Sequence, residues 1–106
     1  MIEKKNNKLT LLHFENLSRY KGIDHFVSTR TGGHSLQPYE ALNLSFQVGD
    51  DPNRVLDNRK RLTETLGIPL ASLTTAEQIH DARVTVVTEE MRGKGSIHHE
   101  EAIANT

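Results

Sequence analysis

The sequence predicts an α/β fold of the α+β kind, in which a layered, mixed β-sheet packs against helices. Three observations carry this prediction. Asp51-Pro52 is a helix start signal and is followed by apolar residues at helical spacing. Residues 41–48 alternate apolar and polar side chains, and residues 83–88 are rich in β-branched side chains. The predicted order is three strands, one helix and two further strands, which is typical of a mixed architecture.

The first thirty residues are predicted to supply two of the strands. Residues 1–8 are polar and are expected to form a flexible arm. The apolar run at 9–14 suits a strand, and residues 15–20 suit a short helical turn. Residues 23–29 are again rich in β-forming side chains, so a second strand is expected there.

A glycine-rich turn at 31–35 separates this region from the clearest strand pattern in the chain. Paired glycines adopt positive φ readily, so Gly32-Gly33 predicts a turn. The period-two pattern at 41–48 then places four apolar side chains on one face: Leu42, Leu44, Phe46 and Val48.

The helix is predicted to run from Pro52 to about Leu66. Asp51 is a typical N-cap, Gly67 is typical just past a C-terminus, and Pro69 forbids continuation. Its apolar stripe consists of Val55, Leu62 and Leu66, with Leu56 beside it. Its charged side chains are expected to form a solvated outer face: Arg54, Arg59, Lys60, Arg61 and Glu64.

The last third of the chain changes character at residue 89. Residues 72–79 are predicted to be strand or extended chain, and the β-branched residues 83–88 predict a strand. Residues 89–106 are polar and without periodicity, which predicts a long loop.

Composition excludes several classes of protein. The 106 residues contain 13 Lys and Arg against 14 Asp and Glu, a net charge of −1, which argues against a nucleic-acid partner held by bulk charge. No apolar run approaches the roughly 20 residues that span a bilayer, and the polar N-terminus does not resemble a secretory signal. With 0 Cys the chain forms neither disulfides nor thiolate metal sites. A cytoplasmic protein is expected, with a small core because only 35% of residues are hydrophobic.

Arg30, at the start of the glycine-rich turn, is the first candidate for chemistry. A guanidinium beside free backbone N–H groups suits an anion such as phosphate. The alternative is an ordinary turn with a surface arginine, which is the more frequent meaning of a Gly-Gly pair.

Histidines provide two further candidates. His80, at the end of the extended stretch 72–79, could be a metal ligand or a general base, although a lone histidine is more often structural or simply exposed. His98-His99-Glu100-Glu101 has the composition of a metal cluster, yet it lies in the polar loop and is expected to be solvated.

Four motifs, taken together, resemble one family. They are residues 26–35 (FVSTRTGGHS), residues 38–44 (PYEALNL), residues 48–52 (VGDDP) with the downstream Val55, Asn58-Arg59 and Leu62, and Gln78-Ile79-His80 with Arg83-Val84. In this order and spacing they resemble the YfiH-like laccase-domain family, whose members are also called polyphenol oxidases and are regarded as purine nucleoside phosphorylases. The resemblance covers residues 24–88.

The resemblance implies a zinc-dependent enzyme of purine nucleoside metabolism. Family members phosphorolyse adenosine, inosine, guanosine and methylthioadenosine, and they also deaminate adenosine. Their zinc ligands are a His in a Gln-Val/Ile-His motif, a Cys in Asp-Cys-Pro and a His in His-Ala-Gly-Trp; the first corresponds to His80, and the other two motifs are absent. Arg30 is then expected to meet phosphate or ribose, Asn43 to orient the substrate, and Gln78 to face the same side as His80.

Family members are well over twice this length, so the chain is expected to correspond to the N-terminal half of the family domain. Residues 9–106 would form one incomplete unit, inactive alone, with purine nucleoside and phosphate as ligands and exposed sheet edges open to self-association. One alternative is a non-catalytic module that binds a nucleotide or a partner chain. A copper phenol oxidase, suggested by the family's older name, ranks last because the sequence offers no cluster of His or Cys ligands.

Overall fold

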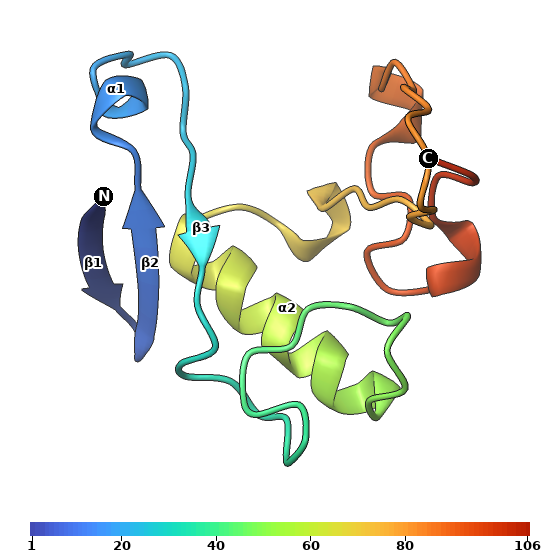
Figure 1. Cartoon of the computed structure of the whole chain (residues 1–106), viewed down its shortest axis with the longest axis horizontal. Helices are drawn as coiled ribbons and strands as arrows, with labels where there is room; N and C mark the ends of the chain where they lie inside the picture. Colours follow the sequence, from blue (N-terminus) through green and yellow to red (C-terminus); the bar gives the residue numbers. More distant parts are fainter.

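A three-stranded antiparallel sheet and one long helix organise the chain (Figure 1). The computed structural model describes residues 1–106. The strands are β1 (Ile2–Asn6), β2 (Leu9–His13) and β3 (Val27–Ser28), in the order β1-β2-β3. The helices are α1 (Glu15–Ser18) and α2 (Pro52–Leu66), and three single 3₁₀ turns follow: η1 (Leu70–Ser72), η2 (Glu89–Met91) and η3 (His99–Glu101). The predicted α+β class is confirmed, with a sheet smaller than expected.

The structure differs from the flexible arm predicted at residues 1–8. Ile2–Asn6 form β1, which pairs along its whole length with β2, from Ile2 opposite His13 to Asn6 opposite Leu9. Asn7 and Lys8 make the two-residue turn between the strands, both with positive φ (48° and 66°). All five side chains of β1 are exposed, so no burial pattern in the sequence indicates this strand.

Helix α2 begins and ends as predicted. The Asp51 carboxylate accepts a hydrogen bond from the Asn53 backbone N–H at 2.9 Å, and Pro52 occupies the first turn. Gly67 ends the helix in the left-handed conformation (φ 73°). The core lies between the helix and the sheet and consists of Leu9, Leu11, Leu42 and Leu62, with Phe26, Leu44 and Leu66 packed against it.

The strand predicted at 41–48 is wrong, because this segment is an irregular loop. Burial does not alternate along it, since Leu42 is buried, residues 43–46 are all half-buried and Val48 is 49% exposed. The backbone N–H groups at the start of the segment form hydrogen bonds with another loop and not with a neighbouring strand. The N–H groups of Ala41 and Leu42 both donate to the Arg30 carbonyl, at 3.0 and 2.9 Å.

The strand predicted at 83–88 is also absent, and of the two alternatives given for 72–79 the structure has no strand there. Residues 83–88 have the composition of a strand but no partner strand within the chain, so they form no ladder. Residues 72–79 contain the end of η1 and a single parallel bridge between Ala76 and Ile103. Beyond residue 89 the predicted loop is confirmed, with the turns η2 and η3 inside it.

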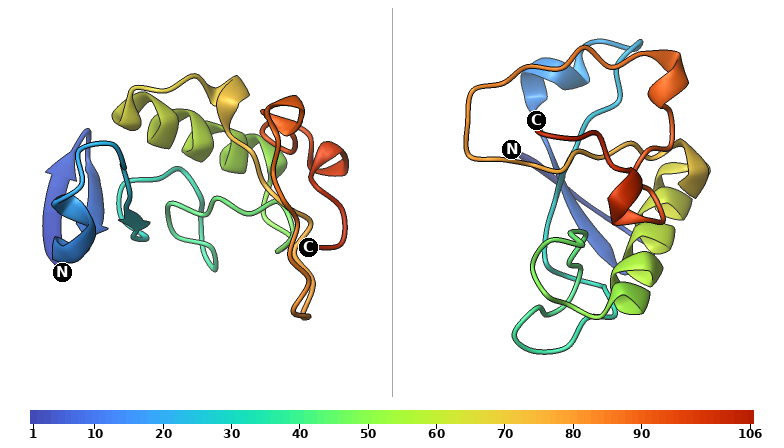
Figure 2. Two further views of the ribbon diagram at one scale, coloured as in Figure 1. Left: turned by 90° about the horizontal axis from the view of Figure 1, so that it is seen from above. Right: turned by 90° about the vertical axis from the view of Figure 1, so that its right-hand side faces the viewer.

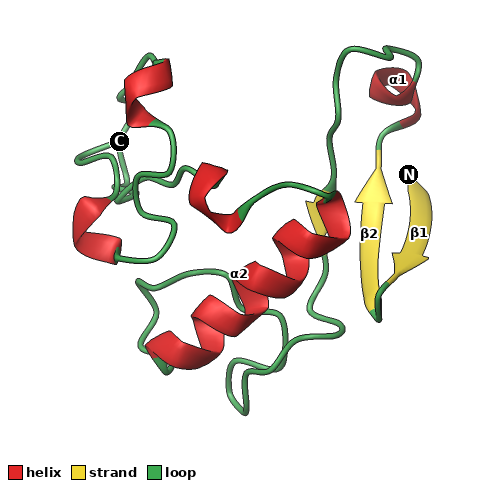
Figure 3. Ribbon diagram, turned by 180° about the vertical axis from the view of Figure 1, so that it is seen from behind, coloured by secondary structure: helices red, strands yellow, loops and turns green.

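Figures 1 to 3 show how these parts are arranged. The β1–β2 hairpin lies at one end, α2 crosses the middle, and the C-terminal segment with η2 and η3 lies at the opposite end (Figures 1 and 3). The trace around residue 80 projects as a long loop (Figure 2). None of the helices combines the length and the hydropathy that crossing a bilayer requires.

The predicted turn at Gly32-Gly33 is a place where two segments of backbone meet. Gly32 has a φ of 93°, as the sequence indicated. Gly33 is needed for a different reason, which is close approach: a Cβ atom there would lie 2.2 Å from the Ala41 carbonyl oxygen and 2.4 Å from the Leu42 Cα. The glycine therefore lets the 41–48 loop lie against the turn.

Gly33→Ala is expected to lower the free energy of unfolding by about 2 kcal/mol or more, because backbone atoms rather than a flexible side chain must move. Gly22→Ala is the matched control, since nothing lies within 4 Å of a Cβ at that position. Urea unfolding measures both changes. Equal midpoints for the two variants would contradict this account of Gly33.

Candidate functional site

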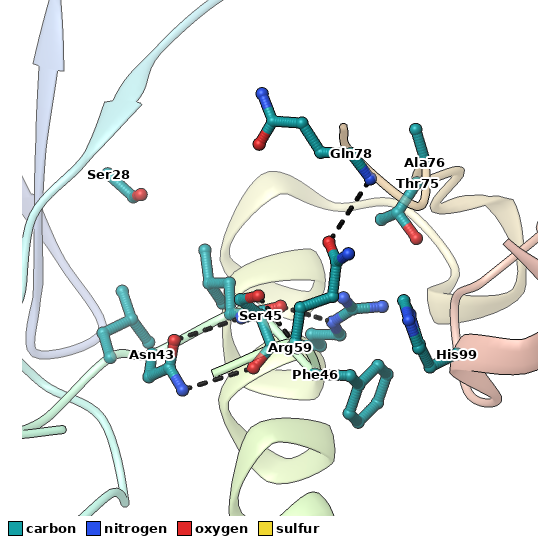
Figure 4. Close-up of a pocket in the computed structure, with 12 residues that line it drawn as sticks. Ser28, Asn43, Ser45, Phe46, Arg59, Thr75, Ala76, Gln78 and His99 are labelled. Carbon is teal, nitrogen blue, oxygen red and sulfur yellow. Dashed lines mark hydrogen bonds between the residues drawn. The ribbon is translucent and has the colours of Figure 1, made fainter. Parts of the chain in front are cut away.

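A cavity of about 370 Å³ lies where the 41–48 loop, helix α2 and the C-terminal segment meet. Figure 4 shows the side chains that surround it. The lining residues are Ser28, Leu42, Asn43, Leu44, Ser45, Phe46, Gln47, Arg59, Thr75, Ala76, Gln78 and His99. Segments far apart in the sequence thus contribute to one concave surface, and concave surfaces are where small molecules bind. Its lining is more polar than is usual for such sites, since 4 of the 12 residues are hydrophobic.

Asn58 of α2 holds the loops that form this surface. Its side chain is fully buried, yet every polar atom has a partner. The Oδ1 atom accepts from the His34 backbone N–H at 2.6 Å. The Nδ2 group donates to the Asn43 carbonyl at 2.8 Å and to the Ser35 hydroxyl at 2.9 Å. One amide therefore joins the glycine-rich turn and the 41–48 loop to the helix.

Arg59, the next residue along α2, is buried and lines the same cavity. Its Nε donates to the Leu44 carbonyl at 2.8 Å, and its Nη1 donates to the carbonyl oxygens of Gly95 and Ser96 at 2.5 and 3.2 Å. The guanidinium carbon lies 4.2 Å from the centre of the Phe46 ring, a cation–π contact. Burial lowers the pKa of Arg59 from its usual value. Its positive charge is thus balanced by carbonyl dipoles and an aromatic face, with no carboxylate in contact.

Asp50 is one of two adjacent acidic residues in the loop that leads into α2. Its carboxylate accepts hydrogen bonds from the Ser35 hydroxyl, from Asn43 Nδ2 at 3.1 Å and from the Asp51 backbone N–H at 2.8 Å. Burial alone would raise the pKa of Asp50. The three hydrogen bonds and the charge of Arg54 outweigh burial, so the pKa of Asp50 lies below its usual value of 3.8.

Two of the residues predicted as catalytic line the cavity together. The Asn43 amide is held by Asp50 and by the Ser45 backbone, to whose carbonyl it donates at 3.3 Å and from whose N–H it accepts at 3.2 Å. Gln78 lies across the cavity with an exposed side chain, and its backbone N–H donates to Gln47 Oε1 at 3.4 Å (Figure 4).

The other two predicted residues do not belong to the lining. Arg30 is exposed, and its Nε donates to the Glu40 carbonyl at 3.1 Å. His80 lies on an exposed bend two residues beyond Gln78. The strand parity predicted for Gln78 and His80 has no counterpart, because residues 77–80 belong to no strand.

The chain brings no three His, Cys, Asp or Glu residues together in a group that could hold a metal ion. His80 stands alone, and His98 of the histidine-rich stretch approaches only Glu100, at 3.8 Å. The residues of this chain therefore do not by themselves fit a zinc site, which needs at least three protein ligands when catalytic.

Sequence reasoning missed three residues of this site. Asn58 and Arg59 are buried, although the charged residues of α2 were expected to be solvated. Their positions in the sequence indicate burial, because Asn58 and Arg59 follow Val55 by three and four residues, which is the spacing of the apolar stripe. His99 is half-buried and lines the cavity, whereas the stretch 98–101 was expected to lie in solvent.

Comparison with known proteins identifies the family to which the chain is similar. The family described as multi-copper polyphenol oxidoreductase laccase matches residues 24–105. A purine nucleoside phosphorylase, YlmD, of Geobacillus stearothermophilus is 41% identical over 70 residues, which are 66% of this chain and 26% of that protein. A purine nucleoside phosphorylase of Corynebacterium glutamicum is 35% identical over 88 residues, which are 83% of this chain and 36% of the relative.

A solved structure agrees with these matches. The crystal structure of the hypothetical protein YfiH of Bacillus licheniformis superposes with a TM-score of 0.83 at 27% identity, covering 95% of this chain and 36% of the other. The chain thus spans between a quarter and about a third of the length of the relatives it matches.

The depressed pKa of Asp50 makes a prediction for stability against pH. A group with a lowered pKa in the folded state stabilises the fold fully above its unfolded pKa, and that contribution is lost as the pH falls through the folded value. The free energy of unfolding of the wild type is therefore expected to decrease when the pH is lowered below about 4. The Asp50→Asn variant should be less stable than the wild type at pH 7, and its free energy of unfolding should decrease less on acidification.

Urea unfolding at several pH values between 7 and 3 tests this, with Asp57→Asn, at an exposed position of α2, as the matched control. An Asp50→Asn variant whose pH dependence equals that of the control would show that Asp50 contributes nothing to acid sensitivity.

Proposed function

Because the chain belongs to the multi-copper polyphenol oxidoreductase laccase family, we propose that it is the N-terminal part of a purine nucleoside phosphorylase. The family match over residues 24–105, with relatives named as purine nucleoside phosphorylases, is the observation that carries this proposal. The proposed substrates are adenosine, inosine, guanosine and methylthioadenosine together with inorganic phosphate, and deamination of adenosine is proposed as a second activity.

In phosphorolysis, a phosphate oxygen forms a bond to C1′ of the ribose while the bond from C1′ to the base nitrogen breaks. The base leaves with the electron pair of that bond and takes up a proton. A protein accelerates such a step by orienting the two substrates and by offering donors to the charge on phosphate. The residues proposed for these tasks are Arg30, Asn43 and Gln78.

Arg30 is proposed to bind phosphate. A guanidinium carries five N–H donors in a planar fork, and the Arg30 Nε is engaged with the Glu40 carbonyl. That bond fixes the plane of the group and leaves the terminal nitrogens to meet two phosphate oxygens side by side, which is the geometry arginine favours. The preceding residues lead toward the cavity, since Ser28 is part of its lining.

Asn43 and Gln78 are proposed to orient the nucleoside in the cavity. A volume of about 370 Å³ lies within the range of small-molecule sites. Asn43 is held in place by Asp50 and Ser45, which favours a fixed wall, whereas the exposed amide of Gln78 is the adjustable partner. Phe46, backed by Arg59, offers an aromatic face against which a purine base can stack.

His80 is proposed as one ligand of a catalytic zinc ion. Zinc would supply a Lewis acid or an activated water when bound. The other ligands would have to come from residues that this chain does not contain, because no three candidate ligands lie together in it. A copper ion, which the older family name implies, would likewise find too few His or Cys ligands in this chain to form a site.

A non-catalytic binding module is the second candidate. It is favoured by one observation, which is that His99 is the only histidine or carboxylate side chain in the cavity lining. A site with so few proton-transfer groups suits binding better than catalysis. The module would take up a nucleoside or nucleotide through the same cavity without turning it over.

Replacing the corresponding segment of Geobacillus stearothermophilus YlmD with residues 24–105 of this chain tests the proposal. The chimera is expected to release hypoxanthine from inosine only when phosphate is present. Arg30→Ala in the chimera should lower kcat/KM for phosphate by about a hundredfold, because a charge-assisted bidentate contact worth roughly 3 kcal/mol is lost.

Lys60→Ala, which removes an exposed charge on α2, is the matched control and should leave kcat/KM unchanged. A folded chimera that binds inosine without phosphate-dependent release would favour the binding module. Equal phosphate kinetics for Arg30→Ala and the control would remove Arg30 from the site.

A further inference from the structure

His99 brings a free imidazole ring to the wall of the cavity. The residue is half-buried and belongs to the lining, yet no hydrogen bond within the chain involves its side chain. Since no fully buried polar side-chain atom lacks a partner, the unpaired ring nitrogens of His99 are accessible. The adjacent His98 is exposed, approaches Glu100 at 3.8 Å and lies outside the lining. Of these two histidines, only His99 is placed to meet a molecule in the cavity.

The backbone that carries His99 is fixed to two other walls of the cavity. The Ile103 N–H donates to the Thr75 carbonyl at 3.0 Å, which joins the end of η3 to the segment that contains Gln78. Arg59 of α2 holds the loop before η3 through its bonds to the carbonyl oxygens of residues 95 and 96. A group whose backbone is held before binding loses little conformational entropy when it meets a ligand.

The cavity has two ends, which Figure 4 separates. Ser28, two residues before Arg30, lies at one end, and Phe46 and His99 lie at the other. Arg30 is the residue proposed to bind phosphate, and Phe46 is the one proposed to stack with the base. A nucleoside whose ribose is directed toward Arg30 therefore turns its base toward Phe46 and His99.

The chemistry of imidazole matches one atom that purine bases share. A neutral imidazole carries one N–H donor and an imidazolium carries two, so a donor is present in either protonation state. Purines present the acceptor N7 whatever group they carry at C6, which is an acceptor in guanine and a donor in adenine. The acceptor N3 lies on the edge beside the ribose, whereas N7 lies on the opposite edge. N7 is thus the acceptor available to a donor at the base end of the cavity.

We propose that His99 determines specificity for purines by donating a hydrogen bond from its imidazole to N7 of a base stacked on Phe46. This inference rests on the proposed function in one respect, which is that a purine nucleoside occupies this cavity. It does not depend on turnover, because the contact is made to the intact nucleoside. A base without N7 leaves the imidazole donor unpaired on binding, and such a loss weakens binding.

Isothermal titration calorimetry of the 106-residue chain with inosine and with 7-deazainosine, in which a C–H group replaces N7, tests the contact. The wild type is expected to bind inosine about tenfold more tightly than 7-deazainosine. His99→Ala should weaken the binding of inosine to the level of 7-deazainosine and leave the binding of 7-deazainosine unchanged. His99→Gln keeps an N–H donor and should restore part of the preference.

His98→Ala is the matched control, since His98 is the neighbouring histidine outside the lining, and it should keep the full preference for inosine. Three results would each overturn the proposal: equal binding of the two nucleosides by the wild type, a preference that survives in His99→Ala, or no binding of inosine.

The chimera with YlmD distinguishes this inference from the proposed function. In the chimera, His99→Ala should lower kcat/KM for inosine about tenfold, and His98→Ala should leave it unchanged. Phosphate-dependent release of hypoxanthine with equal kcat/KM in both variants would overturn the role of His99 and leave the phosphorylase proposal standing. Discrimination of N7 through His99 in the binding experiment, without release by the chimera, would support the inference and favour the non-catalytic binding module.

Discussion

The buried amide of Asn58 is the interaction on which the irregular half of this structure depends. Loops buried against a helix must place their backbone N–H and C=O groups somewhere, because an unpaired buried polar group costs about 1–3 kcal/mol. In a sheet the neighbouring strand would supply those partners. Here the Asn58 side chain does so, bonding the His34 N–H and the Asn43 carbonyl from one position on α2.

Other polar residues of α2 repeat this arrangement along the helix. Arg54 donates to the His34 carbonyl at 2.9 Å and Arg61 to the Gly32 carbonyl at 2.7 Å. Arg59 bonds the C-terminal segment in the same way, because its guanidinium donates to the carbonyl oxygens of Gly95 and Ser96. The helix therefore has two tasks, since its leucines close the core against the sheet while its amide and guanidinium groups fix the loops. The cavity is a consequence of the second task, because its walls are the segments so fixed.

Local signals in the sequence predicted the parts of the fold that local interactions determine. The bounds of α2 follow from Asp51, Pro52 and Gly67, each of which acts on the nearest turn of backbone. Residues 41–48 and 83–88 have equally clear strand patterns, but a strand also needs a partner, and pairing depends on the whole topology. β1 shows the converse, since pairing with β2 forms a strand that its exposed side chains do not indicate.

The sequence motifs predicted some of the residues that line the cavity. Asn43 and Gln78 do so, whereas Arg30 and His80 lie outside its lining. Buried polar residues were the harder part, because polarity in a sequence is ordinarily taken as exposure. Asn58 and Arg59 stand at core positions of the helical period, and that position, rather than their residue type, indicates their burial.

Hydrogen exchange at the His34 amide tests the role of Asn58 most directly. In Asn58→Leu, which keeps a similar side-chain volume without the polar atoms, this amide is expected to exchange about tenfold to a hundredfold faster, while amides of the β1–β2 hairpin keep their protection relative to global unfolding. Asn53→Ala, on the exposed side of the same helix, serves as the control. Unchanged exchange at His34 in Asn58→Leu would contradict the account, because the His34 amide would then be protected by something other than the Asn58 side chain.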